Sequence, residues 1–243
     1  MSSKWAVVTG AGKRLGLEVA RRLGRRGFTI VAHANGSTAG AEELRAELGA
    51  EGCHVHVVRA DLASEEGQGA LVEAVRALTP RLDAIVHNAG IFERVPFEAI
   101  DRARYARMQA INTEAPFFVT QGLLGELRAA PAPCVVHVTD IAADRPIPGY
   151  AHYSVSKAGL VMLTRALASE LAPHVRVNAV APGTVMFPED FDDETRARFL
   201  ARIPLRREGS ASDIASAVAY LVDDAPFVTG QVLAVDGGRS VVL

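Results

Sequence analysis

Short, continuous apolar runs rich in β-branched residues recur along the chain and alternate with longer stretches that have helical spacing. Runs without polar alternation are typical of strands that are covered on both faces, as in a parallel sheet. They predict strands at residues 5–9, 28–33, 53–60, 82–88, 133–139, 175–182 and 231–238. The intervening patterns predict helices at residues 15–27, 41–50, 66–78, 97–110, 112–129 and 151–172.

The repeated strand–helix order predicts an α/β fold, namely a Rossmann-like, doubly wound sheet of seven mainly parallel strands with helices on both faces. No Pro-, Gly- or Ser-rich linker and no change in composition divides the chain, so we expect residues 1–243 to form a single domain. The least regular stretch follows the sixth strand, and we expect residues 184–205 to form a substrate lid.

Composition and charge exclude several classes of protein. The 243 residues are 49% hydrophobic and 22% charged, as in folded globular proteins, which argues against disorder. A formal net charge of -2 gives no footprint for nucleic acid or for an anionic membrane. The first residues contain no apolar signal core, and no apolar run is long enough to cross a bilayer, so we expect a cytoplasmic protein without a membrane partner.

Cysteine and histidine usage adds no metal chemistry to this picture. Cys53 and Cys134 lie in apolar, strand-like runs and are interpreted as buried thiols of a reducing compartment. His54 and His56 share one side of a strand, but no nearby carboxylate or third histidine completes a set of metal ligands. We therefore expect no metal site.

The first strand is followed directly by the turn TGAGKRLG, residues 9–16, which opens a helix. Glycines in a strand-to-helix turn let the backbone approach a pyrophosphate, which then binds at the helix N-terminus. Because this turn lies within a strand–helix–strand unit, it predicts a dinucleotide site. Its middle position is Arg14 rather than glycine.

The end of the second strand indicates which dinucleotide is bound. NAD-selective sites usually place Asp or Glu there, but this chain has the sequence AHANGST without an acid. An acid would repel the 2′-phosphate of NADP, whereas Lys13, Ser37 and His33 are candidates to bind it. The stretch contains no arginine. We predict NADPH as the cofactor.

Tyr153 and Lys157 are four residues apart in a predicted helix, so they share one face of it. A nearby positive charge lowers the pKa of a phenol by stabilising the phenolate. The tyrosine can then act as a general acid toward a carbonyl or an imine as hydride arrives, and the lysine can bind the nicotinamide ribose. Taken alone, the pair also fits the surface of an amphipathic helix.

Several motifs together resemble the short-chain dehydrogenase/reductase family over essentially the whole chain. In order and spacing they are TGAGKRLG, HNAG at 87–90, Asn112 in the dipeptide IN, YSVSK at 153–157, APG at 181–183 and VDGG at 235–238. The resemblance implies a seven-stranded Rossmann-like sheet, a nicotinamide cofactor and usually a homotetramer. It also implies that Asn112, Tyr153 and Lys157 form a proton relay.

Positions matched to the family carry its expected cofactor contacts. The resemblance implies binding of NADPH by Gly10, Lys13, Arg14, Leu15, Gly16, His33, Asn35, Gly36, Ser37, Asp61, Leu62, Asn88, Ala89, Gly90, Tyr153, Lys157, Pro182, Gly183 and Thr184.

The family's fourth catalytic position ordinarily holds serine, thirteen residues before the tyrosine, and here it is Asp140. Together with TGAGKRLG, this replacement resembles the pteridine reductases and dihydromonapterin reductases within the family. Phe92 matches the aromatic residue that stacks a pterin in those enzymes, and Arg14 matches an arginine that contacts both cofactor phosphate and pterin. The resemblance thus implies a substrate site of Arg14, Phe92, Asp140 and Tyr153, with Asp140 a fourth catalytic residue.

These residues predict NADPH-dependent reduction of a C=N bond in a dihydropterin such as dihydrobiopterin or dihydromonapterin, with dihydrofolate as a further candidate. We expect the charge of Asp140 to raise the pKa of Tyr153, against the effect of Lys157, and so to keep the phenol an acid. Two alternatives stay open. One is a carbonyl reductase acting on a 3-oxoacyl thioester, ketone or alcohol, and the other is an NADP(H)-binding sensor without turnover.

Overall fold

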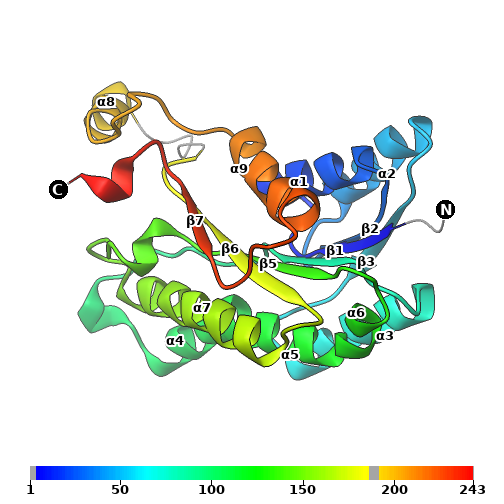
Figure 1. Cartoon of the computed structure of the whole chain (residues 1–243). Helices are drawn as coiled ribbons and strands as arrows, with labels where there is room; N and C mark the ends of the chain where they lie inside the picture. The colour runs from blue at the N-terminus through cyan, green and yellow to red at the C-terminus, as the bar shows by residue number, and fades with distance from the viewer. Residues whose placement is uncertain (1–3, 186–191, 243) are drawn as a thin grey trace.

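A computed structural model describes residues 4–185 and 192–242, which form one seven-stranded sheet in the order β3-β2-β1-β4-β5-β6-β7 (Figure 1). All of its strand pairs are parallel. The strands are β1 Lys4–Val8, β2 Phe28–Ala34, β3 Val55–Arg59, β4 Ala84–His87, β5 Cys134–Val138, β6 Arg176–Pro182 and β7 Val232–Val235. The predicted fold class is confirmed, and each predicted strand is present.

The first three predicted helices and the predicted helix at 151–172 are present, whereas those predicted at 97–110 and 112–129 differ from the structure. They are α1 Arg14–Arg25, α2 Ala39–Ala50, α3 Glu65–Leu78, α4 Arg102–Gln109, α5 Ala115–Gly122, α6 Leu124–Arg128, α7 Ala151–Glu170, α8 Asp193–Leu200 and α9 Ala211–Ala219. The predicted helix at 97–110 begins only at Arg102, where Asp101 caps it by accepting a hydrogen bond from the Arg104 amide. The predicted helix at 112–129 is instead a π-helical turn, Ala110–Glu114, followed by α5 and α6.

The predicted lid at 184–205 is only partly covered by the described residues, because 186–191 lie outside them. Within the remainder, the expectation of an irregular segment was wrong for Asp193–Leu200, which form α8. Asp192 begins this helix by accepting a hydrogen bond from the Thr195 amide at 2.7 Å. A role as lid stays a prediction.

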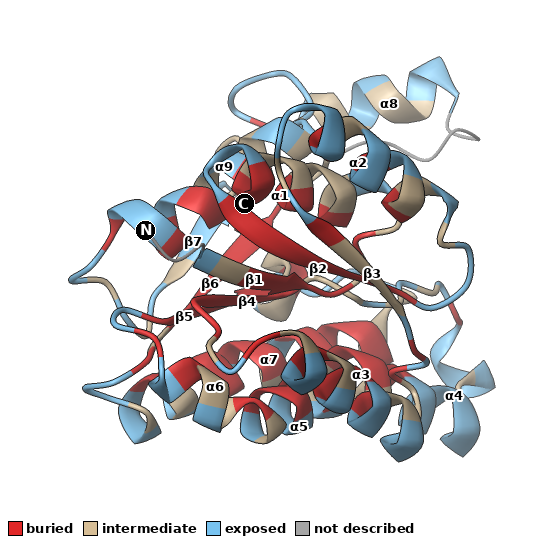
Figure 2. Cartoon of the chain, turned by 90° about the vertical axis from the view of Figure 1, so that its right-hand side faces the viewer, coloured by how far each residue is buried: buried red, intermediate tan, exposed pale blue. Residues whose placement is uncertain are grey.

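Two helical layers cover the sheet, with α1, α2 and α9 on one face and α3, α5, α6 and α7 on the other (Figures 1 and 2). Side chains alternate across each strand. Thus Ala6 and Val8 pack in the cluster that contains Leu23 of α1, whereas Val7 packs in the cluster that contains Leu71 of α3. Both faces of β1 are therefore apolar, which explains why its sequence shows no polar alternation.

Disulfide bonds, metal-ligand clusters and membrane-spanning helices are absent from the described residues. Cys53 and Cys134 are both free thiols, as predicted, but only Cys134 is buried, whereas Cys53 is partly exposed. Among the residues that the structure describes, no group of three or more His, Cys, Asp and Glu side chains is arranged to hold a metal ion. Within those same ranges, no helix has the length and apolar character needed to cross a membrane.

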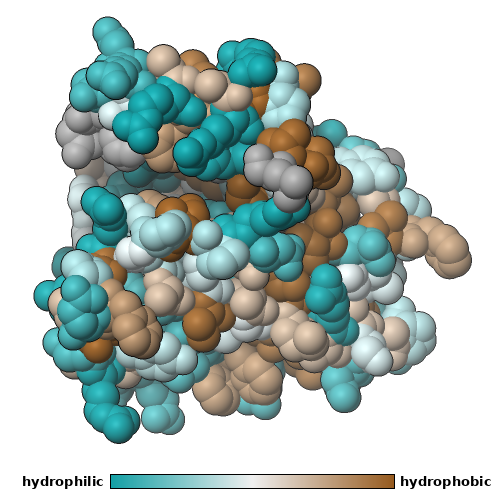
Figure 3. Space-filling view, turned by 90° about the vertical axis from the view of Figure 1, so that its left-hand side faces the viewer, coloured by the Kyte–Doolittle hydropathy of each residue, from teal (hydrophilic) through white to brown (hydrophobic). Residues whose placement is uncertain are grey.

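Strand order reverses between β1 and β4, since the chain first adds β2 and β3 on one side of β1 and then β4 on the other. In open α/β sheets, ligands bind beyond the carboxyl ends of the strands at this switch point. Figure 3 views the molecule from that edge and shows that it is hollowed. The loops after β1 and β4 border the hollow.

Candidate active site

The loops after β1 and β4 are tied together at the switch point by Thr9 and Asn88. The Thr9 hydroxyl accepts hydrogen bonds from the amides of Asn88 and Ala89, both at 3.0 Å. The Asn88 side chain in turn donates to the carbonyls of Thr9 and Gly10 at 3.0 and 3.2 Å. Gly10 has φ +68°, and a Cβ there would lie 2.9 Å from the Cα of Ala89, so only glycine fits this crossing.

Helix α1 presents an uncapped N-terminus to the cavity. Lys13 is the N-cap residue and makes no side-chain capping bond, and the first turn contains no acidic residue. The N–H groups of the first helical turn and the positive end of the helix dipole therefore suit an anion such as a pyrophosphate. Gly16 is equally constrained, since a Cβ there would lie 2.2 Å from the Gly10 carbonyl oxygen. On these observations the predicted dinucleotide fits the turn.

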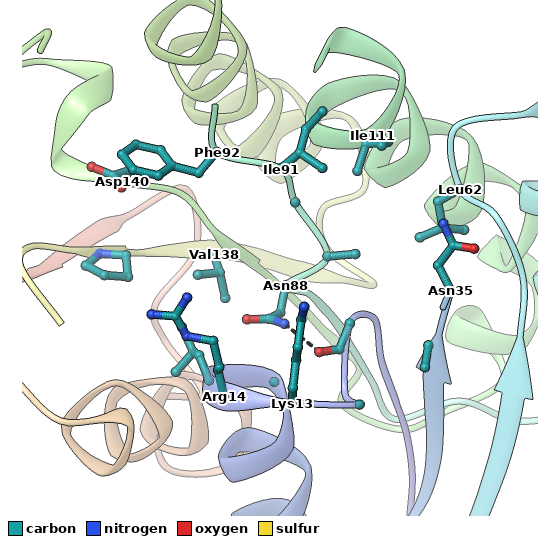
Figure 4. A pocket seen from close by; sticks show the side chains of 18 of the residues that line it. Lys13, Arg14, Asn35, Leu62, Asn88, Ile91, Phe92, Ile111, Val138 and Asp140 are labelled. Atoms are coloured by element: carbon teal, nitrogen blue, oxygen red, sulfur yellow. Dashed lines mark hydrogen bonds between the residues drawn. The ribbon is translucent and has the colours of Figure 1, made fainter. Parts of the chain in front are cut away.

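Arg14 occupies the glycine position of this turn with a backbone φ of 51°, in the left-handed region. Holding a residue with a Cβ in that region costs roughly 1–2 kcal/mol. Figure 4 shows Lys13 and Arg14 rising from the start of α1 into the cavity, with Arg14 on the side toward Asp140. The strain is consistent with a side chain selected for its charge rather than for its backbone preference.

Replacing Arg14 therefore has two separable effects. Arg14→Gly is expected to relieve about 1 kcal/mol of strain and raise Tm by roughly 2–4 °C in thermal unfolding without ligand. It should also raise the Kd for NADPH about tenfold in a fluorescence titration, because a phosphate-binding cation is lost. Arg14→Ala is the matched control, which should lose the same affinity without gaining stability. A lower Tm for Arg14→Gly than for Arg14→Ala would show that the backbone at this position is not strained.

The end of β2 carries an arginine neighbour that the sequence did not reveal. Asn35 follows the strand, and its carbonyl accepts a hydrogen bond from Nε of Arg59 at 3.0 Å. Arg59 comes from β3, whose register places it opposite Ala34. Lys13 and Ser37 line the cavity nearby, as predicted for a 2′-phosphate site. The stretch after β2 has no arginine of its own, but the folded chain brings Arg59 beside it from β3.

His33 supports the turn instead of facing outward. Its side chain is 1% exposed, its Nδ1 accepts a hydrogen bond from the Gly10 amide at 3.2 Å, and its Nε2 lies 3.0 Å from the carbonyl of Ala60. Burial lowers the pKa of the ring, so His33 is neutral near pH 7. Since both ring nitrogens are engaged, we revise its role from a 2′-phosphate ligand to a residue that positions the turn.

Asp140 and Tyr153 form a direct hydrogen bond at the other end of the cavity. The phenol Oη of Tyr153 donates to Oδ2 of Asp140 at 2.8 Å, while Oδ1 accepts from the Ala142 amide at 2.7 Å. Burial raises the pKa of Asp140, although these two hydrogen bonds oppose the shift. Burial and the neighbouring carboxylate hold the pKa of Tyr153 well above its usual value. The predicted direction of the tyrosine shift is confirmed, and the phenol is an acid at neutral pH.

Lys157 lies on the same face of α7 as Tyr153 and is buried beneath it. Its Nζ donates to the carbonyl of Val138 at 2.8 Å and lies 5.8 Å from the centre of the Tyr153 ring. Burial lowers the pKa of Lys157 to about 8, with the charge of Asp140 acting in the opposite direction. The ammonium is therefore close to titrating in the neutral range.

Turnover is accordingly expected to fall as pH rises through about 8. Below that pH Lys157 is a charged ammonium that can bind a ribose hydroxyl and stabilise negative charge on Tyr153, and above it the amine is neutral. The measurement is kcat/KM across roughly pH 6 to 10. Lys157→Arg keeps its charge throughout, so its residual activity should lack the decline. A wild-type profile that stays flat over the alkaline limb would contradict the titration of Lys157.

Asn112, the third predicted relay residue, is buried below the loop that follows β4. Its Oδ1 accepts from the Ile91 amide at 2.9 Å, and its Nδ2 donates to the Ile91 carbonyl at 3.1 Å and to Ser156 Oγ at 3.0 Å. Asn112 lies in the π-helical turn between α4 and α5, a distortion often found at functional sites, and its bonds reach out of that turn to the loop after β4 and to α7. The amide thus fixes the loop that carries Phe92, and its part in a relay stays a prediction.

Phe92 lies beside the Asp140–Tyr153 pair, as Figure 4 shows for Phe92 and Asp140. One face of its ring stacks on Tyr150, with centroids 4.3 Å apart, and its ring meets Tyr153 edge to face at 4.7 Å. Phe92 is nevertheless 57% exposed, so a flat surface is left for a substrate. Sequence reasoning missed Tyr150, although its position three residues before Tyr153 was a usable signal.

A cavity of about 1000 Å³ joins these groups. Predicted cofactor and substrate residues in its wall are Gly10, Lys13, Arg14, Leu15, Gly16, His33, Asn35, Gly36, Ser37, Leu62, Asn88, Ala89, Gly90, Phe92, Asp140, Tyr153, Lys157, Pro182 and Gly183. Asp61 and Thr184 do not line it, and neither does Asn112. Asp61 instead accepts a hydrogen bond from the Asn35 side chain at 3.0 Å. Wall residues that were not predicted are Gly12, Ala34, Ile91, Glu93, Arg107, Ile111, Val138, Thr139 and Val185.

A helix N-terminus suited to a pyrophosphate and a buried tyrosine–lysine pair open onto one cavity, which is the arrangement of a dinucleotide-dependent oxidoreductase. Comparison with known proteins narrows this class. A family model described as enoyl-(acyl carrier protein) reductase matches residues 10–240. The 3-oxoacyl-[acyl-carrier-protein] reductase of Staphylococcus aureus strain Mu50 is 30% identical over 240 residues, which cover 97% of this chain and 98% of that protein. The chain belongs to the short-chain dehydrogenase/reductase family of oxidoreductases.

Solved structures agree with this assignment. A structure described as an NAD(P)-dependent gluconate 5-dehydrogenase from Beutenbergia cavernae, with bound NADP at low occupancy, has a TM-score of 0.91 and 35% identity and covers 98% of this chain and 97% of its own. Acetoin dehydrogenase from Enterobacter cloacae has a TM-score of 0.91 and 31% identity and covers 99% and 97%. By their names, these relatives are carbonyl or alcohol oxidoreductases, and they support the carbonyl-reductase alternative better than the pterin prediction.

Proposed function

We propose that this chain uses NADPH to reduce a C=N bond of a dihydropterin to the tetrahydro form. The observation that carries the proposal is the hydrogen bond from Tyr153 to Asp140, a carboxylate at the position where the family ordinarily has serine. A serine hydroxyl can donate to a ketone oxygen, but an ionised carboxylate only accepts. It therefore suits a ring N–H or a protonated ring nitrogen, which it binds by a charge-assisted hydrogen bond.

In this mechanism the reaction adds one hydride to the ring carbon and one proton to the adjacent nitrogen. NADPH, when bound, supplies the hydride. Tyr153 supplies the proton, since burial and Asp140 keep its pKa well above neutral. A proton from solvent water then restores the phenol, whose hydroxyl again donates to the ionised carboxylate of Asp140. Lys157 stabilises the phenolate until reprotonation is complete.

The choice of NADPH rests on charge at the end of β2. Lys13 lines the cavity and Arg59 contacts Asn35 from the neighbouring strand, whereas no acid stands directly after β2. Two cations suit a 2′-phosphate. The NADP bound in the Beutenbergia cavernae structure supports the same cofactor for this chain.

In the proposed complex, the pterin ring stacks on the side chain of Phe92. Phe92→Ala is expected to raise KM for dihydrobiopterin about tenfold, because aromatic stacking contributes roughly 0.5–1.5 kcal/mol. The Kd for NADPH should change less than about twofold. Phe97→Ala removes a more exposed ring in a neighbouring turn and serves as the control. Equal losses for pterin and NADPH would argue against stacking.

The proposal is tested by tracing the hydride. With NADPH deuterated at the transferable position of its nicotinamide, one deuterium should appear on a ring carbon of tetrahydrobiopterin formed from dihydrobiopterin, as measured by mass spectrometry and NMR. NADPH consumption without deuterium in the pterin would refute the proposed reaction. NADPH binding without consumption for any pterin or carbonyl compound would instead favour a sensor.

Carbonyl reduction is the second candidate, and the relatives named above favour it. The tyrosine–lysine pair would serve it equally well, with Tyr153 protonating an alkoxide oxygen. Carbonyl reduction does not explain the carboxylate of Asp140, because this negative group would repel the negative charge that develops on the carbonyl oxygen. Acetoacetyl thioesters, ketones and sugars tested with NADPH separate the two candidates.

We also propose that the chain assembles with copies of itself, as a homotetramer. Helices α5 and α7 expose large apolar side chains, including Phe118 at 51%, Val155 at 51% and Met162 at 60%. Apolar groups gathered on neighbouring helices are typical of an interaction surface. Light scattering of the purified protein should give the mass of four chains, and the mass of a single chain would overturn the assembly.

A further inference from the structure

A second cavity lies next to the proposed substrate site, between the loop that precedes α7 and helix α8. It has a volume of about 480 Å³. Ile147, Pro148, Tyr150 and Phe199 form apolar walls, and guanidinium groups come from arginines of two distant segments. Its lining, as far as the structure describes the chain, contains no acidic residue.

Three arginines line this cavity: Arg94 lies in the loop after β4, Arg198 lies in α8, and Arg202 lies just beyond it. Arg94 packs against Gly149, where an added Cβ would come within 3.2 Å of its Cγ and Nε. None of the three forms an ion pair with a carboxylate of the described residues. Asp192 at the start of α8 interacts electrostatically with Arg198, but no direct ion pair within the described residues neutralises the three guanidinium groups.

Arg239 adds a fourth guanidinium behind the wall. Its Cζ stands 5.3 Å from the ring centre of Phe199, and its Nη1 is buried without a hydrogen-bond partner among the described residues. Burial and the charge of Arg202 lower the pKa of Arg239, while Asp140 and Asp236 act in the opposite direction. An electropositive region thus extends from this cavity toward the catalytic carboxylate.

Tyr150 connects the two cavities. It lines the smaller cavity, and its ring stacks on Phe92, which lines the larger one with Asp140. In a substrate whose reacting ring contacts Phe92, only the ring of Tyr150 therefore separates that ring from the arginine-lined cavity. Guanidinium forks bind carboxylates and phosphates in paired hydrogen bonds, and the apolar walls suit the linker that would carry such a group.

We propose that Arg94, Arg198 and Arg202 form a subsite for the anionic tail of the substrate. Its preferred substrate is then a dihydropterin whose side chain ends in a carboxylate or a phosphate, rather than a neutral dihydropterin. The pterin part of this statement rests on the proposed function, whereas the binding of an anionic tail rests on the cavity itself.

The first test compares substrates with the same ring and different tails. Dihydrofolate carries carboxylates, dihydroneopterin monophosphate carries a phosphate, and dihydrobiopterin is neutral. In the double variant Arg198→Gln/Arg202→Gln, KM should rise at least about tenfold for the preferred anionic substrate and less than about twofold for dihydrobiopterin. Arg128→Gln at the end of α6 is the control for loss of an exposed arginine, and thermal unfolding checks that each variant is folded.

The second test does not depend on turnover. Calorimetric titration of the NADP-saturated protein with p-aminobenzoyl-glutamate and with inorganic phosphate should show binding of one of them, weakened at least about tenfold in the double variant. The probe that loses affinity identifies the tail as carboxylate or phosphate. Loss of tail binding in a protein that reduces no pterin would refute the proposed function and leave the subsite standing. Equal affinities in wild type and variant, or equal KM changes for neutral and anionic pterins, would overturn the subsite.

Discussion

Tyr153→Phe is expected to lower kcat for dihydropterin reduction by about a thousandfold, within the range of 10²–10⁴ that general acids contribute. The substitution removes the proton donor but keeps the ring that packs edge to face on Phe92. NADPH affinity should change less than about threefold, because phenylalanine keeps the ring and Lys157 can still bind the nicotinamide ribose. Single-turnover kinetics and an equilibrium NADPH titration measure the two quantities separately.

Tyr105→Phe is the matched control, since Tyr105 is an exposed tyrosine of α4. Its activity should equal that of the wild type. If Tyr153→Phe retained more than about a tenth of wild-type kcat, another group would have to protonate the ring nitrogen. Asp140, with its raised pKa, would then be the strongest candidate.

Asp140→Ser is expected to lower kcat/KM for dihydropterins by about a hundredfold and to raise the rate with acetoacetyl thioesters. Serine can donate a hydrogen bond to a carbonyl oxygen, but it cannot bind a protonated heterocycle by a charge-assisted bond. Removal of the carboxylate also removes the charge and the hydrogen bond that raise the pKa of Tyr153. The tyrosinate absorbance of this variant should therefore appear at lower pH than in the wild type.

Asp140→Asn separates charge from shape in the same experiment. Asparagine keeps the size of the side chain but carries no charge, so pterin turnover should fall nearly as far as in Asp140→Ser. Wild-type pterin turnover in either variant would show that the carboxylate has no role in the reaction. An unchanged tyrosinate titration would show that Asp140 does not control the phenol.

The sheet could be predicted from sequence because of how its strands are buried. Val7 packs on one helical layer while Ala6 and Val8 pack on the other, so the pattern is locally visible as a continuous apolar run. The helical segment around Asn112 could not be predicted in the same way. Its π-helical turn coincides with hydrogen bonds between the Asn112 amide and Ile91, which is a tertiary interaction that no local period encodes.

In the candidate site, too, local motifs could be predicted from the sequence, whereas residues brought together by tertiary structure could not. The turn with Arg14 and the pair Tyr153 and Lys157 are short local motifs, and they were found where the sequence predicted them. Arg59 reaches Asn35 only through the register of β3 on β2. The arginine-lined cavity likewise depends on α8, a helix in a segment that was expected to be irregular.

In the proposed reaction, the carboxylate of Asp140 selects a ring nitrogen over a carbonyl oxygen. The ratio of kcat/KM for dihydrobiopterin to kcat/KM for an acetoacetyl thioester, measured on the wild-type protein with NADPH at one pH, tests this selection most directly. We predict a ratio above about a hundred, equivalent to roughly 2.7 kcal/mol of preferential transition-state binding. A ratio below one would contradict it and assign the chain to carbonyl reduction.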